Sequence, residues 1–166
     1  MGPSRRVQAL DVRGLPPRLA RLKRTIELAT RGVLGAHSID AYALSITFVS
    51  DRRIAGINRR ALGRRGATDV IAFDLSEAGL PCGLVGDVYI SLGRARASSR
   101  AFKVSEREEI IRLVAHGVLH VVGYSDATAA ARRRMESFQE EVVKQVLPGR
   151  RTATAVPRRP RRRTGA

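Results

Sequence analysis

The chain has 166 residues, 43% of them hydrophobic, which is enough for one domain with its own core. A single cysteine, Cys82, excludes an internal disulfide and a zinc finger built on cysteines. No apolar run reaches the length of a membrane helix, and no apolar segment follows the N-terminal residues, so we expect a cytoplasmic protein without a signal peptide.

Charge is the strongest compositional signal. The chain carries 31 Lys and Arg against 15 Asp and Glu, a net charge of +16, which predicts a polyanionic partner, most often nucleic acid. Almost all of these bases are arginine, whose planar guanidinium binds phosphate oxygens in pairs, although arginine-rich codon usage would give the same composition. Residues 148–166 combine arginine and proline with no acid. We expect them to be a disordered basic tail that either aids solubility or grips phosphates.

Residues 1–147 alternate predicted strands and helices. Alternating apolar and polar residues indicate strands, and apolar residues that recur every three or four positions indicate helices. The pattern predicts strands over 6–12, 41–49, 69–75 and 84–91, and helices over 16–34, 51–62, 92–102, 105–122 and 127–147. Four strands and about five helices fit a single α/β or α+β domain, whose strand order the pattern does not reveal.

Several residues mark where these helices begin and end. Ser50 is placed to cap the helix over 51–62, and Gly35 is expected to end the first helix. Ser105 and Glu108 form a capping-box pattern before a long apolar run. Gly123 follows that run and suits the left-handed residue after a helix end. The helix between Ser105 and Gly123 is therefore the best defined of the set.

Two of the three histidines, His116 and His120, lie four residues apart in that helix. Side chains at this spacing share one helix face, so both imidazoles can point at one cation. Gly123 lets the chain reverse, which would bring the carboxylate of Asp126 back toward them. Two imidazoles and one carboxylate leave a fourth position open on zinc, which is the catalytic arrangement. Two other interpretations stay open: the histidines are packed core residues, and Asp126 caps the last helix.

The string around these histidines resembles a known family signature. Residues 116–126 read H-G-V-L-H-V-V-G-Y-S-D and are similar to the H-G-x-L-H-L-x-G-Y-D-H signature of the YbeY-type endoribonucleases, bacterial metalloproteins of rRNA maturation. Residues 67–73, A-T-D-V-I-A-F, resemble the family's P-T-D-V-L-S-F strand. Residues 84–91, L-V-G-D-V-Y-I-S, resemble its L-G-D-I-x-I-S strand. These blocks keep the family's order and cover about residues 42–146.

The resemblance implies a mixed four-stranded sheet with helices on its faces and one zinc ion, or another divalent metal, in a cleft beside it. It assigns the metal to His116, His120 and Asp126, with Asp126 standing where the family has a third histidine. It also implies that Thr68 and Asp69 help to shape the cleft. The implied substrate is RNA, as an rRNA precursor, with the ribosome or its proteins as possible partners.

A basic segment lies upstream of the resembling strands. A family arginine that precedes the glycine of a basic loop falls on Leu62 in this chain. Our hypothesis is that neighbouring arginines contact phosphate in its place, namely Arg59, Arg60, Arg64 and Arg65.

The sequence is compatible with three functions. The first is a zinc-dependent endoribonuclease that acts on single-stranded segments of rRNA during maturation and ribosome quality control. The second is a catalytically weakened RNA-binding or ribosome-assembly factor that uses the same basic surface. The third is a small metalloprotease, and Gly117 argues against it, because zincin proteases place a glutamate base directly after the first histidine.

Overall fold

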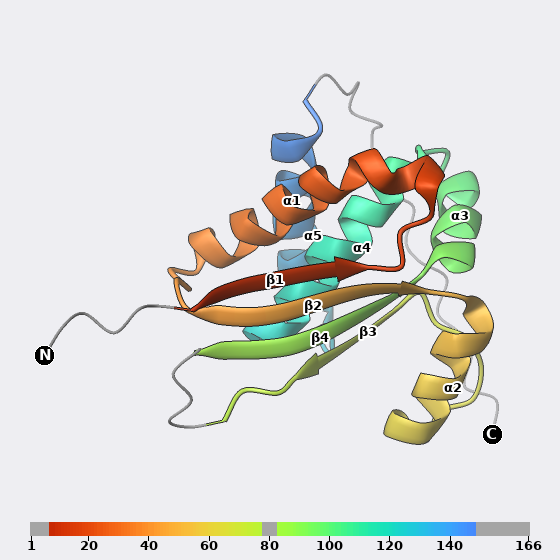
Figure 1. Ribbon diagram of the computed structural model, residues 1–166, viewed down its shortest axis with the longest axis horizontal. Coiled ribbons are helices and arrows are strands. Elements are labelled where there is room, and N and C mark those ends of the chain that lie inside the picture. Colours follow the sequence, from red (N-terminus) through yellow and green to blue (C-terminus); the bar gives the residue numbers. More distant parts are fainter. Residues whose placement is uncertain (1–6, 78–82, 149–166) are drawn as a thin grey trace, which may run out of the picture.

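A computed structural model describes residues 7–77 and 83–148 of the chain. Cys82 and all of the predicted tail except Pro148 lie outside the described residues. Within them the elements follow in the order β1 (Gln8–Arg13), the 3-10 helix η1 (Pro17–Leu22), α1 (Lys23–Ala36), β2 (Tyr42–Val49), α2 (Asp51–Leu62), β3 (Val70–Asp74), β4 (Leu84–Ser91), α3 (Leu92–Ala101), α4 (Glu106–Val122) and α5 (Ala129–Val146) (Figure 1).

The strands of the described chain form one mixed four-stranded sheet in the order β1-β2-β4-β3. β1, β2 and β4 are parallel, whereas β3 runs antiparallel to β4 at the edge of the sheet. With five α-helices in the described residues, this confirms the expected single α/β domain and the mixed sheet that the resemblance implied. In the described part of the chain, no helix combines the length and the apolar character needed to cross a membrane.

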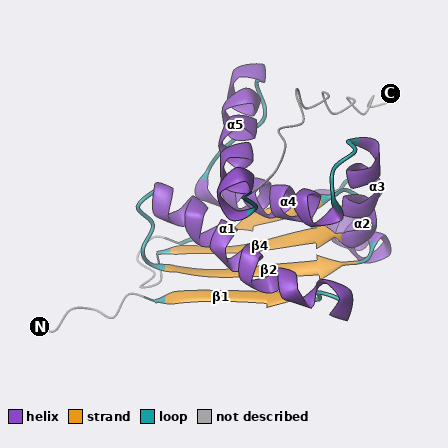
Figure 2. Cartoon of the chain, turned by 90° about the horizontal axis from the view of Figure 1, so that it is seen from above, coloured by secondary structure: helices purple, strands orange, loops and turns teal. Residues whose placement is uncertain are grey.

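The main core lies between the sheet and the helices α1 and α4. Figure 1 shows α1, α4 and α5 on one side of the sheet, and Figure 2 shows α1 crossing the strands obliquely. Alternate residues of β2 face these helices, as the sequence pattern predicted, and they are joined by inward residues of β4: Leu44, Ile46, Phe48, Val88 and Ile90. Burying this apolar face contributes about 25 cal/mol for each Å² removed from water.

Helix α2 packs on the opposite face of the sheet, at the β3 edge (Figure 1). Ile54 of α2 is fully buried against Val49 and Ile71. Phe73 of β3 and Tyr89 of β4 pack around this cluster from the same face. The sheet therefore separates α2 from α4, and this separation decides where the candidate site residues lie.

The predicted caps of the two central helices are confirmed. The Ser50 hydroxyl accepts a hydrogen bond from the Arg53 backbone N–H at 3.2 Å, and Ser105 accepts one from Glu108 at 3.1 Å. Gly123 ends α4 with φ 109°, a left-handed conformation that glycine adopts without steric cost.

The first helix differs from its prediction at both ends. It begins as the 3-10 helix η1 and continues through Gly35 to Ala36. The left-handed residue is Ser38, with φ 55°, and the Ile39 N–H closes the helix end by donating to the Leu34 carbonyl at 2.9 Å. The expectation that Gly35 ends the helix is wrong, because the closing bonds form around a non-glycine residue three positions later.

A buried ionic cluster joins α4 to α5. Arg112 donates to Glu108 at 2.7 Å and to Glu109 at 2.8 Å on its own helix, and it also donates to Glu140 of α5. Burial acts to lower the pKa of the Arg112 guanidinium, but the hydrogen bonds to Glu140 and Glu108 outweigh it and raise that pKa above its ordinary value. The cluster fixes α5 against α4, the helix that carries both histidines of the candidate site.

Candidate metal centre

His116 and His120 bring two ring nitrogens together on one face of α4. Both rings are half-buried, and their Nε2 atoms lie 3.1 Å apart. The two rings meet edge to face, with centroids 4.6 Å apart and an angle of 83° between their planes. The two imidazoles therefore converge on one helix face, as the spacing of four residues predicts.

Both rings are oriented by hydrogen bonds at their other nitrogens. His120 Nδ1 lies 3.0 Å from the carbonyl oxygen of Tyr124, and because a carbonyl only accepts, Nδ1 carries the proton. His116 Nδ1 likewise faces Oε1 of Gln139 on α5 at 3.2 Å. With Nδ1 of each ring held in this way, the two Nε2 atoms face each other, which is the arrangement typical of histidines that share a metal.

Asp126 completes the group from the loop that follows α4. Ligand atoms of His116, His120 and Asp126 all lie within 4.8 Å of one another. The reversal at Gly123 makes this approach possible, and Arg132 of α5 holds the loop by donating to the Asp126 carbonyl at 3.0 Å. Asp126 does not cap the last helix.

That cap is Thr128, whose hydroxyl accepts from the Ala131 N–H at 3.1 Å. The helix cap and the candidate metal ligand are therefore two different side chains of the loop before α5. Thr128 satisfies the helix N-terminus, and the exposed carboxylate of Asp126 stays available beside the histidines.

This donor set fits zinc. Zinc binds histidine nitrogen at about 2.0–2.1 Å in tetrahedral geometry, which separates two nitrogens on one ion by roughly 3.3 Å. The observed separation of the two Nε2 atoms is 3.1 Å. Two lone pairs at that distance repel each other unless a cation or a proton lies between them. Two imidazoles and a carboxylate also leave the fourth tetrahedral position open.

Gly117, between the two histidines, faces the sheet. A Cβ atom there would overlap Val88 and would lie 3.2 Å from Cγ2 of Val70. On the strand side, a Cβ at Gly86 would overlap Val121 and lie 2.9 Å from the Phe73 carbonyl oxygen. The two glycines let α4 lie close on β4, and a glutamate at position 117 would point into the sheet and away from the histidines.

The candidate phosphate contacts do not join the histidine cluster. Arg59 and Arg60 occupy the last turn of α2, on the other face of the sheet, and all four predicted arginines are exposed. Arg64 and Arg65 lie in the loop that follows α2.

Thr68 and Asp69 precede β3. They are half-buried, and the Thr68 hydroxyl donates to the Asp69 carboxylate at 3.2 Å. The Asp69 carbonyl accepts from the Ser91 N–H at 2.9 Å, which ties this segment to the end of β4. The two residues directly precede Val70, the β3 residue that a Cβ at Gly117 would contact.

The two groups that orient the rings, Gln139 and the Tyr124 carbonyl, are not among those predicted from the sequence. Gln139 had a signal: it lies between Met135 and Val142 on the buried stripe of α5, where a polar side chain needs a partner. No sequence signal points to the Tyr124 carbonyl, because every residue has a backbone carbonyl.

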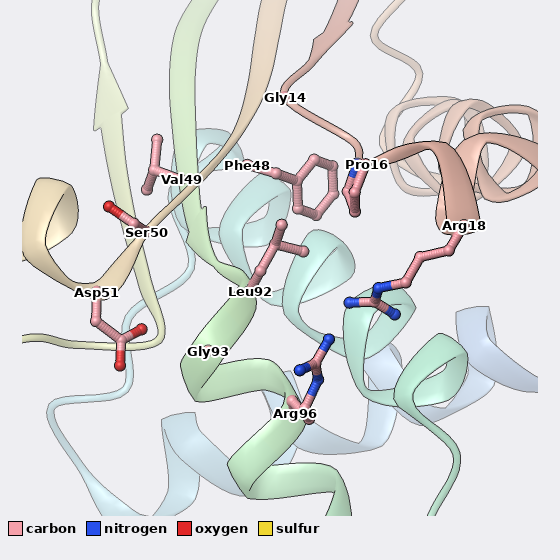
Figure 3. A pocket seen from close by; sticks show the side chains of 10 residues that line it. All are labelled: Gly14, Pro16, Arg18, Phe48, Val49, Ser50, Asp51, Leu92, Gly93 and Arg96. Atoms are coloured by element: carbon pink, nitrogen blue, oxygen red, sulfur yellow. The ribbon is translucent and has the colours of Figure 1, made fainter.

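A separate hollow of about 510 Å³ lies where the parallel strands end (Figure 3). Arg18 and Arg96 point toward each other on one side, and Asp51 lies on the other. Both guanidinium groups bind Glu106, Arg18 at 2.6 Å and Arg96 at 3.5 Å. Glu106 and Asp51 together balance the two positive charges, which argues against an anion site here.

The stability that the ion pairs of Glu106 contribute depends on pH. The hydrogen bond from Arg18 holds the pKa of the Glu106 carboxyl below its ordinary value. A lowered folded-state pKa contributes stability above the unfolded pKa, about 4.3, and that stability is lost as pH falls through the folded value. We expect Glu106→Gln to lower the melting temperature at pH 7 by about 2–4 °C, for a partly exposed pair worth at most about 1 kcal/mol.

The deficit of Glu106→Gln should shrink as the pH falls below about 4. Melting curves of both proteins between neutral and acid pH test this, with Glu141→Gln as the control, because Glu141 is an exposed acid on α5. An equal deficit at every pH would show that the change acts through packing rather than through charge.

Comparisons with known proteins agree with this geometry. A family model described as Endoribonuclease YbeY matches residues 18–147. The Endoribonuclease YbeY of Anaeromyxobacter sp. (strain Fw109-5) is 38% identical over 125 residues, and the match spans 75% of this chain and 64% of that protein. The Persephonella marina protein of the same name is 34% identical over 127 residues, spanning 75% of this chain and 83% of that one.

A solved structure has the same fold. The solution structure of TM1509 from Thermotoga maritima superposes with a TM-score of 0.57 at 23% identity, and the match covers 82% of this chain and 88% of that one. At this identity the likeness concerns the fold alone.

Proposed function

Because this chain belongs to the endoribonuclease YbeY family, we propose that it is a metal-dependent endoribonuclease in which His116, His120 and Asp126 hold one zinc ion. The observation that carries the proposal is the convergence of their ligand atoms within 4.8 Å. Two of the three donors are nitrogens, which favours zinc, whereas the carboxylate alone would favour a harder divalent ion.

Hydrolysis of a phosphodiester needs an activated oxygen nucleophile and compensation of negative charge on the phosphoryl group. A zinc ion held by these ligands supplies a Lewis acid and brings the pKa of a bound water close to about 7. The chain's own residues keep the two rings in place: Gln139 and the Tyr124 carbonyl hold the Nδ1 protons, so that each Nε2 presents a lone pair. Thr68 and Asp69 line the approach along β3 in this proposal.

RNA is favoured over a peptide as substrate on two grounds. The net charge of +16 favours a polyanion. Position 117, which holds the base in zincin proteases, is a glycine packed against Val88 and offers no proton acceptor.

The cellular role follows from the resemblance. We propose single-stranded segments of precursor rRNA as the substrate, in rRNA maturation and ribosome quality control. The ribosome or a ribosomal protein would be the partner, and the cytoplasm the compartment. A domain over residues 1–147 followed by a basic tail would carry out this role.

The proposal is tested by measuring zinc content and RNA cleavage together, in wild type and Asp126→Ala. We expect about one zinc per wild-type chain by mass spectrometry, a strongly reduced content in the variant, and cleavage that chelation stops and zinc restores. Asp126→His, which supplies an imidazole in place of the carboxylate, should retain zinc. A wild-type protein that takes up no zinc and cuts no RNA would leave the RNA-binding factor as the function.

A further inference from the structure

On the face of the sheet opposite to the metal ligands, α2 and the loop after it form an open groove of about 920 Å³. Arginines from both ends of the helix line it, and small residues lie between them. Its lining includes Arg52, Arg53, Gly56, Arg59, Arg60 and Arg65. We call this surface the α2 groove.

Among the residues that the structure describes, the guanidinium groups of the α2 groove have no acidic partners. In the described residues none of its five arginines forms an ion pair, and its lining contains no acid. The acid of α2 itself, Asp51, accepts a hydrogen bond from Ser91 instead. Four like charges on α2 and a fifth, Arg65, in the loop after it repel one another, and an anion relieves that repulsion.

Some arginines of the described residues are paired with acids, in contrast to those of the α2 groove. Arg18 and Arg96 share Glu106, and Arg112 binds three carboxylates. The α2 groove lacks this internal compensation, so its charge is available to a ligand.

The spacing of these arginines suits a chain of phosphates. Arg52 and Arg59 are seven residues apart, which places them about 10 Å apart along the helix axis. Each guanidinium can bind two phosphate oxygens, so the two ends of the groove can hold separated phosphates of one strand. The lining contains no aromatic residue, so bases are not stacked there and the contacts are with the backbone.

We propose that the α2 groove is an RNA-binding site that holds the phosphate backbone of the substrate across the sheet from the metal ligands. The proposal rests on the endoribonuclease function, because that function requires a strand of RNA. β3 lies at the sheet edge between the two surfaces: Ile71 packs with α2, whereas Val70 packs with the α4 side. RNA held in the groove reaches the metal around the outer edge of β3.

The test compares two double variants of the full-length protein. Arg52→Ala/Arg59→Ala removes two groove charges, and Arg24→Ala/Arg31→Ala removes two exposed charges at the same seven-residue spacing on α1. Binding of a fluorescein-labelled single-stranded RNA of about 16 nucleotides is measured by anisotropy over a series of salt concentrations.

We expect the groove variant to bind about tenfold more weakly, with a salt dependence reduced by about 1.4 in the slope of log K against log salt. The α1 variant should stay within about twofold of wild type with an unchanged slope. Equal losses in the two variants would overturn the proposal, because the groove would then act only through net charge.

A second comparison separates this proposal from the metal site. Groove substitutions are combined with Asp126→Ala, and the tenfold loss of RNA affinity should persist unchanged, since surfaces on opposite faces act independently. A loss that disappears in the Asp126→Ala background would place the RNA contact at the metal site and overturn the groove. If the protein binds no zinc but the groove variant still loses affinity, the endoribonuclease proposal fails and the groove stands.

Discussion

Replacing His120 with alanine is expected to remove bound zinc and to lower the rate of RNA cleavage by at least about 100-fold. The loss has two causes, because the variant lacks one ring nitrogen and leaves the His116 Nε2 without the neighbour that lies 3.1 Å away. Changes that only orient such ligands already cost 10–100-fold in metal affinity or activity, so removal of a ligand costs more. Zinc content by mass spectrometry and cleavage under single-turnover conditions measure the two effects.

The same measurements on His116→Ala and on the double variant show whether the two histidines act as one unit. Groups that act as one unit are non-additive, so each single change should remove nearly all activity and the double change should remove little more. Melting temperatures of all three variants check that the half-buried positions still fold. Losses that multiply in the double variant would show that the histidines work separately and do not share a metal.

Replacing Arg112 with leucine is expected to destabilise the protein by about 3–5 kcal/mol, or roughly 6–20 °C in melting temperature. The change leaves the buried carboxylates of Glu108 and Glu109, and the neighbouring Glu140, without their guanidinium. Buried charge that loses its partner keeps its desolvation cost, and this cost exceeds what a leucine recovers by apolar burial. Calorimetry or urea unfolding measures the difference.

Two further substitutions isolate the cause. Arg107→Leu makes the same chemical change at an exposed position of α4 and should alter the free energy of unfolding by less than about 0.5 kcal/mol. Arg112→Lys keeps the charge but cannot reach three carboxylates with one planar fork, so it should fall between wild type and Arg112→Leu. An Arg112→Leu protein within about 1 kcal/mol of wild type would refute a stabilising role for the cluster.

The elements of this fold are largely predictable from local chemistry. The bounds of α2 and β4 agree with their predictions, because Ser50 caps one and an apolar run between turn residues defines the other. The end of α1 is not predictable in this way, since its closing hydrogen bonds form around Ser38 and not around Gly35. A glycine shows where a left-handed backbone conformation has little steric cost, but tertiary contacts decide where the helix ends.

The candidate site is predictable only in part. Helix periodicity relates His116 to His120, and a single turn relates them to Asp126, so the proximity of all three follows from short-range geometry. The four arginines are predicted from their charge and from their closeness to Leu62, where the family has an arginine, and neither observation tells which face of the sheet they occupy. Only the packing of Ile54 against Ile71 shows that α2 lies across the sheet from α4.

The contact between Gly117 and Val88 also limits how this fold can change its chemistry in evolution. A single codon change at position 117 could create the glutamate that peptide hydrolysis requires, yet the new side chain would enter the space that Val88 and Val70 already fill. Such a lineage would first have to raise the helix from the sheet, and the intermediate would lose the packing that holds both histidines. The close approach of helix and strand thus prevents a single substitution at position 117 from supplying that glutamate to the histidines.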